Sequence, residues 1–352
     1  MKTKERLNHL DLLKFIALLF VCFSHVYQRT VPSATQTLIF GIFYSVHMSM
    51  FMFVGGYLVK RCDSFKELCK YFSRMLLYYV YPALVFTILT VISMERYSSK
   101  NVLYWLNEFY VRTDTFYWYA ISAVIINTLL AIAFYLANKM IRNKGLGRDV
   151  ARNAILLMIF ALLFLPIIFI FKSETPGMLA ANLTVEFVPL AIAGFLIRSF
   201  GGYVKDGARS RIIEIAVGII CLVAYIIALI NFRGWLNKDT NTRLLLHQLG
   251  ALAGVYVYYV LAKWLCRIKS ITNVCSYGRY SYSVYLVHVY LIRVITPYVS
   301  RITDVNFYSA SFVIIYALVF TFGSIVISIA LTKNKYINLL LFGDYKPFLK
   351  HA

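Results

Sequence analysis

The chain has 352 residues, of which 61% are hydrophobic and only 14% are charged, and its mean hydropathy is +0.70. This composition excludes a soluble globular protein, because such a chain would expose far too much apolar surface to water. The formal net charge of +21 does not indicate a nucleic-acid ligand, since the basic residues are dispersed over short segments that would border lipid headgroups.

Ten apolar runs predict an all-α, polytopic membrane protein. The runs are close to the length of about 20 residues that crosses a bilayer, and they lack the alternation of an outer-membrane strand. The first run follows a charged segment without a small-residue cleavage site, so we expect a retained helix rather than a cleaved signal peptide. The predicted helices lie near residues 10–27, 37–59, 75–94, 116–138, 154–171, 179–199, 212–232, 244–262, 280–299 and 306–332.

An even number of helices places both termini on one side of the membrane. If that side is the cytoplasm, 25 of the 36 Lys and Arg residues lie inside and 10 lie outside, while Lys14 falls within the first helix. This asymmetry follows the positive-inside rule and predicts cytoplasmic termini. We expect one membrane domain over residues 1–352, with a core of about 6–332 and a short basic cytoplasmic tail at 333–352.

The first predicted helix, LDLLKFIALLFVCFSH, carries Asp11, Lys14 and His25. His25 follows Lys14 by eleven positions, which brings their side chains to within roughly 20° of one face and about 16 Å apart along the axis. A charged group and a titratable group therefore share one stripe across most of a bilayer. The structural alternatives are that Lys14 reaches the headgroups and that His25 is an interfacial or core histidine.

Among the other ionisable side chains inside predicted helices, the serious candidates for a functional role are His47, Glu186 and His288. An ionisable group in hydrocarbon costs at least about 2.5 kcal/mol and usually faces a cavity. Glu186 suits a cavity role or a structural ion pair, and it could pair with His25 because both are predicted in the outer half of the membrane. Ser281 and Tyr285 share one helical face with His288, either lining the cavity or bonding to neighbouring helices.

Two basic segments between helices, KRCDSFKELCKYFSR and KMIRNKGLGRDVAR, are dense enough to receive a phosphate-bearing cytoplasmic ligand. Contact with the membrane surface explains most of their charges equally well. The six cysteines form no CxxC pair and no His-adjacent metal spacing, so we predict no disulfide framework and no metal site.

Three segments carry a family pattern: LDLLKFIALLFVCFSH, FYSVHMSMFMFVGGYL and YGRYSYSVYLVH. Together they resemble the integral-membrane acyltransferase-3 family, and more closely its sugar O-acetyltransferase branch, over nearly the whole chain. In the family's first helix a basic residue precedes a histidine by eleven positions, as Lys14 precedes His25 here. The second segment is similar to His-Met-Pro-Leu-Phe followed by Ser-Gly-Tyr-Leu. The third is similar to Gly-Lys-Ser-Ser-Tyr-Leu-His, with Arg279 near the usual lysine and His288 at its end.

The chain departs from that pattern at three places. Ser49 stands where proline is usual, and Gly55 stands where serine is usual, so any role of that serine hydroxyl is absent here. The family's paired arginines appear only as Lys70 and Arg74, with altered spacing.

The resemblance implies transfer of an acyl group, usually acetyl, from cytoplasmic acyl-CoA to a hydroxyl of a cell-surface or lipid-linked saccharide. His25 would act as a base or acyl carrier, with Lys14 stabilising charge on the CoA side. Lys60, Arg61, Lys70 and Arg74 are the candidate ligands of the CoA phosphates. Asp11, His47, Glu186, Ser281, Tyr285 and His288 are the candidate residues for the acceptor or the cavity wall.

The expected co-substrate is acyl-CoA, without a tightly bound cofactor, and the expected location is a bacterial cytoplasmic membrane. The main competing function is a glycolipid or saccharide transporter or flippase, which would also place His, Glu and Lys around a midplane cavity. A transporter often shows paired Gly- or Pro-broken helices and corresponding halves, which this sequence does not display. A membrane polysaccharide polymerase is a further alternative, although it would be expected to have a larger outer loop.

Overall fold

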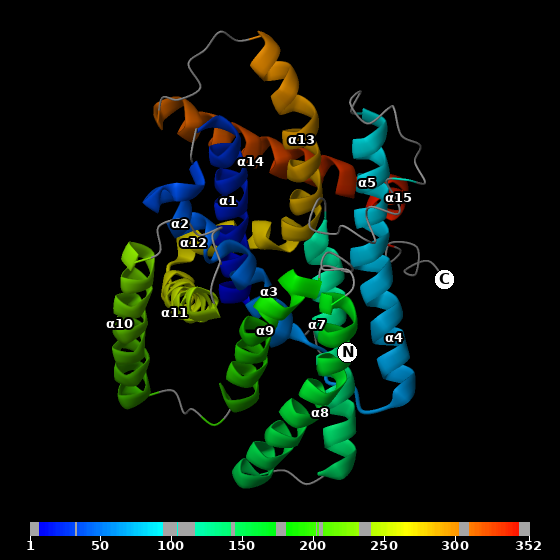
Figure 1. Ribbon diagram of the computed structural model, residues 1–352, viewed down its shortest axis with the longest axis vertical. Helices are drawn as coiled ribbons and strands as arrows, with labels where there is room; N and C mark the ends of the chain where they lie inside the picture. The colour runs from blue at the N-terminus through cyan, green and yellow to red at the C-terminus, as the bar shows by residue number, and fades with distance from the viewer. Residues whose placement is uncertain are drawn as a thin grey trace. The chain divides into compact units, whose positions relative to one another are not determined.

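A computed structural model describes residues 7–31, 34–93, 104, 117–141, 145–173, 181–201, 203, 207–231, 241–302 and 310–344 (Figure 1). Every regular element within these ranges is helical, which confirms the predicted all-α class. The α-helices are α1 (Asn8–Thr30), α2 (Leu38–Tyr44), α3 (His47–Leu58), α4 (Phe65–Met75), α5 (Tyr81–Ser93), α7 (Trp118–Met140), α8 (Leu146–Ser173), α9 (Ala181–Gly201), α10 (Ala208–Asn231), α11 (Asn241–Leu265), α12 (Lys269–Cys275), α13 (Ser281–Ile302), α14 (Ala310–Lys333) and α15 (Lys335–Phe342).

Within the described ranges, nine helical segments are long and apolar enough to cross a membrane, which confirms a multi-pass membrane protein. The ninth predicted range, 280–299, corresponds to the helix α13, which is not among these nine segments. The side of the membrane on which the termini lie stays a prediction.

The first compact unit consists of residues 1–54 and 204–329. Helix α1 is its central element and packs against α2, α11, α12 and α13, while α10 packs along α11. Near the end of α1, Val26 lies in a buried apolar cluster with Ile292 of α13 and with Ala317 and Phe320 of α14. These contacts hold the helix that carries Lys14 and His25 inside its unit.

The second unit consists of residues 55–203 and 330–352, and α7 is its central element, packed against α4, α8 and α9. Small residues allow close helix contacts of the kind common in membranes. At Gly56, in the last turn of α3, an added Cβ would lie only 1.9 Å from the carbonyl oxygen of Ala191 in α9. The prediction of one domain over the whole chain is not tested by this division and stays a prediction.

The third predicted helix, 75–94, was placed too late in the sequence. Helix α4 begins at Phe65 and continues through a π-helical turn, Leu76–Val80, into α5. Ser64 caps α4, because its Oγ accepts a hydrogen bond from the backbone N–H of Glu67 at 3.2 Å. The charges of α4 make this amphipathic helix resemble a loop when only hydropathy is counted, whereas Ser64 and Glu67 are a recognisable capping pair.

The predicted C-terminal tail contains a helix, α15, which is capped by the Asn334 side chain. It packs against α5, where the Tyr81 hydroxyl donates to the carbonyl oxygen of Leu340 at 2.8 Å. The helix ends at Gly343, whose φ of 67° suits glycine. The apolar stretch in KYINLLLF explains why this part of the tail is folded onto the unit.

All six cysteines are free, but two of them lie side by side. The sulfur atoms of Cys266, after α11, and Cys275, at the end of α12, are 3.3 Å apart. Burial, together with the neighbouring Cys275 thiol, raises the pKa of Cys266 to about 12. Because the thiolate is the reactive form, this pair should stay reduced near neutral pH and react faster as the pH rises.

Treatment with diamide is expected to join Cys266 and Cys275, more rapidly at pH 9 than at pH 7. Two thiols give up two hydrogens to the azo bond of diamide and form one disulfide. Non-reducing peptide mapping by mass spectrometry checks this, because Arg267 and Lys269 allow trypsin to separate the two halves. If exposed Cys69 is oxidised under these conditions while the cross-linked peptide is missing, the arrangement of α11 and α12 is wrong.

Candidate functional site

Three histidines from distant parts of the sequence meet within the first unit. The ring centroid of His25, on α1, lies 5.7 Å from that of His288, on α13, and 6.4 Å from that of His47, at the start of α3. His47 is 3% exposed and His288 is fully buried, whereas His25 is partly exposed. His25 is therefore the accessible member of this histidine cluster.

Two of the three rings are held by their own chain. The Nδ1 atoms of His47 and His288 lie 3.1 Å from the carbonyl oxygens of Phe43 and Val284, respectively. A carbonyl oxygen can only accept a hydrogen bond, so each Nδ1 carries the proton and each neutral ring presents its Nε2 lone pair. The buried Nε2 of His288 has no hydrogen-bond partner among the described residues.

A break between α2 and α3 places His47. The sequence predicts one continuous helix over 37–59, but Ser45 and Val46 form a turn and His47 begins α3. Broken backbone at membrane depth must find other hydrogen-bond partners. Tyr225 of α10 supplies one such partner, because its hydroxyl donates to the carbonyl oxygen of Ile42 at 2.8 Å. The same hydroxyl lies 3.1 Å from the side-chain oxygen Oγ of Ser45.

Ser49, which replaces the family's usual proline, also contributes to this break. Its hydroxyl donates to the carbonyl oxygen of Ser45 at 3.2 Å. A proline there could not make this bond, so the serine ties the first turn of α3 to the end of the break.

The predicted face of α13 lies in the interior of the unit. Ser281, Tyr285 and His288 are 7%, 4% and 0% exposed. The Tyr285 ring lies 5.6 Å from the His288 ring, and the Tyr44 ring lies 5.0 Å from the His47 ring. Aromatic side chains therefore border the histidine cluster from both α2 and α13.

Lys14 is paired with Asp11 one turn earlier on α1, with Lys14 Nζ 2.6 Å from Asp11 Oδ1. The side chain of Lys14 is 19% exposed and that of Asp11 is 9% exposed, so the pair is largely buried. Gly278 lies against the same turn, because a Cβ there would be 1.9 Å from the carbonyl oxygen of Asp11. The segment just before α13 thus rests directly on the backbone beside Lys14.

Glu186 belongs to α9 in the second unit and is 9% exposed. On the same helix, Thr184 bonds to Ser122 of α7, with 2.8 Å between their hydroxyl oxygens. Phe187 stacks on Trp118 with ring centroids 5.2 Å apart. These contacts anchor the helix around Glu186, whose pairing with His25 stays a prediction.

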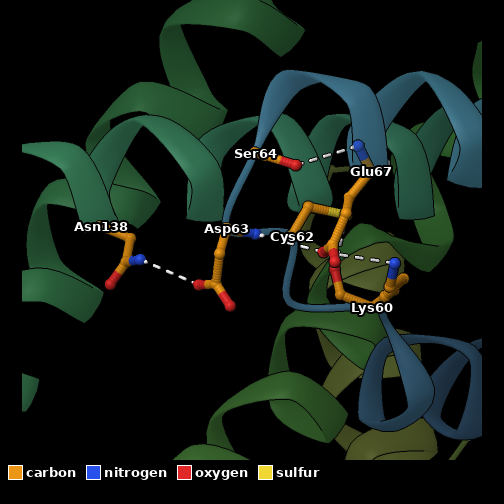
Figure 2. Close-up of polar contacts among 6 residues, drawn as sticks. All are labelled: Lys60, Cys62, Asp63, Ser64, Glu67 and Asn138. Atoms are coloured by element: carbon orange, nitrogen blue, oxygen red, sulfur yellow. Dashed lines mark hydrogen bonds and ion pairs between the residues drawn. The ribbon is translucent and has the colours of Figure 1, made fainter.

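The four predicted CoA ligands have different surroundings. Lys60 Nζ is paired with Glu67 Oε2 at 3.3 Å, in the loop that Figure 2 shows. The same figure shows Asn138 of α7 donating to Asp63 at 3.2 Å, which ties this loop to the unit.

The other three predicted CoA ligands differ in exposure. Lys70 and Arg74 are exposed on α4. Arg61 instead is partly buried and donates to Ser199 Oγ at 2.9 Å.

Gly55, where the family has serine, faces Asn127 of α7. A Cβ at residue 55 would lie 3.1 Å from Asn127 Nδ2, and the buried Oδ1 of Asn127 has no hydrogen-bond partner among the described residues. The Cβ of a serine at residue 55 would therefore contact Asn127 tightly, beside an amide oxygen that could accept a hydrogen bond from the serine hydroxyl.

No group of three or more His, Cys, Asp or Glu side chains in the described part of the chain is arranged to hold a metal ion. The arrangement around His25 is instead suited to proton transfer or nucleophilic attack by imidazole. Arg29 and Arg293 act electrostatically on His25, so its surroundings are positive.

Sequence reasoning did not find the turn at Ser45, the contact of Gly278 with Asp11 or the neighbours of Arg61. No local signal marks the turn at Ser45, because neither glycine nor proline stands at the break. The contact of Gly278 with Asp11 has a weak signal, because a glycine precedes the polar face of α13. The neighbours of Arg61 come from segments far apart in the sequence, so no local pattern predicts them.

A family model described as an acyltransferase domain matches residues 7–333. The matched region contains all twelve predicted site residues. No curated protein and no solved structure is similar enough to count as a match.

Proposed function

The chain belongs to the acyltransferase family, and on that premise we propose that it moves an acyl group, with acetyl as the expected group, from cytoplasmic acyl-CoA to a saccharide hydroxyl. The acceptor is a cell-surface or lipid-linked sugar. The observation that carries the proposal is the partly exposed His25 between two buried imidazoles that present Nε2.

The chemistry has two routes. As a base, His25 takes the hydroxyl proton while the sugar oxygen attacks the thioester carbon, the carbon–sulfur bond breaks, and the CoA thiolate leaves and regains a proton. As an acyl carrier, an imidazole nitrogen attacks the thioester first, CoA leaves as its thiol, and the sugar hydroxyl then receives the acyl group. Both routes develop negative charge on oxygen, which the positive field of Arg29 and Arg293 would stabilise.

Lys14 and Asp11 are proposed as a positioning pair on the CoA side. Their close contact holds the lysine about 16 Å along α1 from His25. Because of this pairing, the positive charge of Lys14 is balanced by the carboxylate of Asp11. Acyl-CoA serves as a co-substrate, without a tightly bound cofactor.

The helix break beside His47 would also suit a saccharide or glycolipid transporter, in which irregular backbone lines the substrate site. Family membership favours the enzyme. The two functions differ in whether CoA is needed.

Incorporation of label from radiolabelled acetyl-CoA into lipid-linked or surface glycan tests the proposal, using membranes with and without the protein. Label that depends on the protein is expected. Absence of label, together with failure of the purified protein to bind CoA, would contradict acyl transfer and favour the transporter.

A further inference from the structure

Three arginines from separate elements lie together in the second unit: Arg61 after α3, Arg152 on α8 and Arg198 on α9. The guanidinium carbons of Arg61 and Arg152 lie 5.6 Å and 5.8 Å from the centroid of the Phe134 ring. Burial first, and then the charges of Arg198 and Arg152, lower the pKa of Arg61. The positive charges of Arg152 and Arg198 are therefore both close enough to Arg61 to repel it.

The carboxylate in contact with this arginine cluster does not balance it. Asp149 pairs with Arg152 and also accepts a hydrogen bond from the Tyr203 hydroxyl. Arg198 donates from Nη1 to the carbonyl oxygens of Tyr57 and Val59, at 2.9 Å each, at the end of α3. Among the residues that the structure describes here, one negative charge thus faces three positive ones.

The arginine cluster also keeps unused hydrogen-bond donors. The Nε atoms of Arg61 and Arg152 are buried and have no hydrogen-bond partner among the described residues. A buried donor left unpaired costs about 1–3 kcal/mol, and more when the group is charged. An anion with several oxygens would satisfy these donors and relieve the repulsion at once.

We propose that Arg61, Arg152 and Arg198 form a binding site for a phosphate-bearing ligand. Guanidinium groups match phosphate oxygens in a forked geometry, and the Phe134 and Phe195 rings hold Arg61 in place. All three arginines fall on the predicted cytoplasmic side. The phosphate could belong to CoA or to a lipid headgroup, because both present the same anionic oxygens to the arginines. The assignment to CoA rests on the proposed function.

This site differs from the set predicted from the sequence, of which it keeps only Arg61. Lys60 is already paired with Glu67 (Figure 2), and Lys70 and Arg74 point to the exposed surface of α4. The proposed site adds Arg152 and Arg198, which sequence reasoning did not single out, and the roles predicted for Lys60, Lys70 and Arg74 stay predictions.

Calorimetric titration of CoA into the full-length protein, in phosphatidylcholine nanodiscs, tests this site. Arg61→Gln is expected to weaken CoA binding at least tenfold, and Arg61→Lys less, because lysine keeps the charge but loses the fork. Arg148→Gln is the matched control, since Arg148 is exposed one turn before Arg152 on α8; it should change binding less than twofold. Thermal unfolding of each variant identifies any that fails to fold.

A second arm identifies the source of the phosphate. Nanodiscs with added phosphatidylglycerol are examined by native mass spectrometry, to see whether the wild-type protein retains anionic lipid and the Arg61→Gln variant loses it. Lipid retention without CoA binding would assign the site to headgroups and overturn the CoA assignment. Equal binding of both ligands by wild type and Arg61→Gln would overturn the site. CoA binding at this site without any transfer would leave the site intact and count against the proposed reaction alone.

Discussion

Replacing His25 with alanine is expected to reduce acyl transfer by about 10²–10⁴-fold if the imidazole is the general base, and to abolish it if the imidazole carries the acyl group. His25 is the accessible ring of the histidine cluster, whereas His47 and His288 are buried and each is hydrogen-bonded through Nδ1 to a backbone carbonyl oxygen. The measurement is label transferred from acetyl-CoA to glycan per unit of folded protein in the membrane.

The matched control is His9→Ala, on the same helix but sixteen residues earlier. It removes an imidazole that lies edge-on to Tyr259, with ring centroids 5.7 Å apart, and should leave transfer nearly unchanged. A His25→Ala protein that inserts normally and transfers at the wild-type rate would contradict the role given to this residue.

An experiment with the wild-type protein can distinguish base catalysis by His25 from transfer through an acylated His25. Incubation with acetyl-CoA in the absence of acceptor should leave an acylated peptide containing His25 if the ring carries the group. Mass spectrometry of rapidly quenched wild-type protein detects that adduct. Its absence while transfer proceeds on addition of acceptor would favour the base.

Gly278→Ala is expected to destabilise the protein by at least about 1–3 kcal/mol and to lower transfer as well. The added Cβ would lie 1.9 Å from the carbonyl oxygen of Asp11, and backbone cannot move aside as a flexible side chain can. The start of α13 would have to move away from α1, which disturbs both the Asp11–Lys14 pair and the position of His288. Thermal unfolding in nanodiscs, followed by the transfer assay, measures both effects.

Gly218→Ala is the corresponding control within the same unit. An added Cβ there meets no atom within 4 Å, and alanine is favoured over glycine inside a helix by about 1 kcal/mol. This variant should be at least as stable as the wild type. A Gly278→Ala protein that is equally stable would show that the contact between α1 and the segment before α13 is looser than described.

Hydropathy predicted most of the fold because each long helix must bury its own backbone polar groups in the bilayer. The range 116–138 corresponds to α7, Trp118–Met140, and 212–232 corresponds to α10, Ala208–Asn231, although Phe116 and residue 232 lie outside the described residues. Hydropathy fails to predict helices that are amphipathic or short. Hydropathy alone predicts basic segments at α4 and α15, because their charges outweigh an apolar face when residues are only counted.

The candidate site was only partly accessible to sequence reasoning. Spacing within one helix predicts a shared face, so Ser281, Tyr285 and His288 could be grouped in advance. Contacts between helices depend on rotation and depth, which spacing does not encode. The sequence therefore gave no reason to place Arg198 beside Arg61, 137 positions earlier, or to expect that Tyr225 would complete a broken helix.

The two hydrogen bonds that hold His47 and His288 have a consequence for proton movement. A histidine that conducts protons onward receives one at one ring nitrogen and releases another from the opposite nitrogen. In both of these rings Nδ1–H is committed to the carbonyl four residues earlier, so a proton can enter and leave only through Nε2. Each ring is a terminus rather than a conduit, and a proton passed to it must return by the same edge. The histidine cluster can exchange protons locally without opening a path for them through either helix.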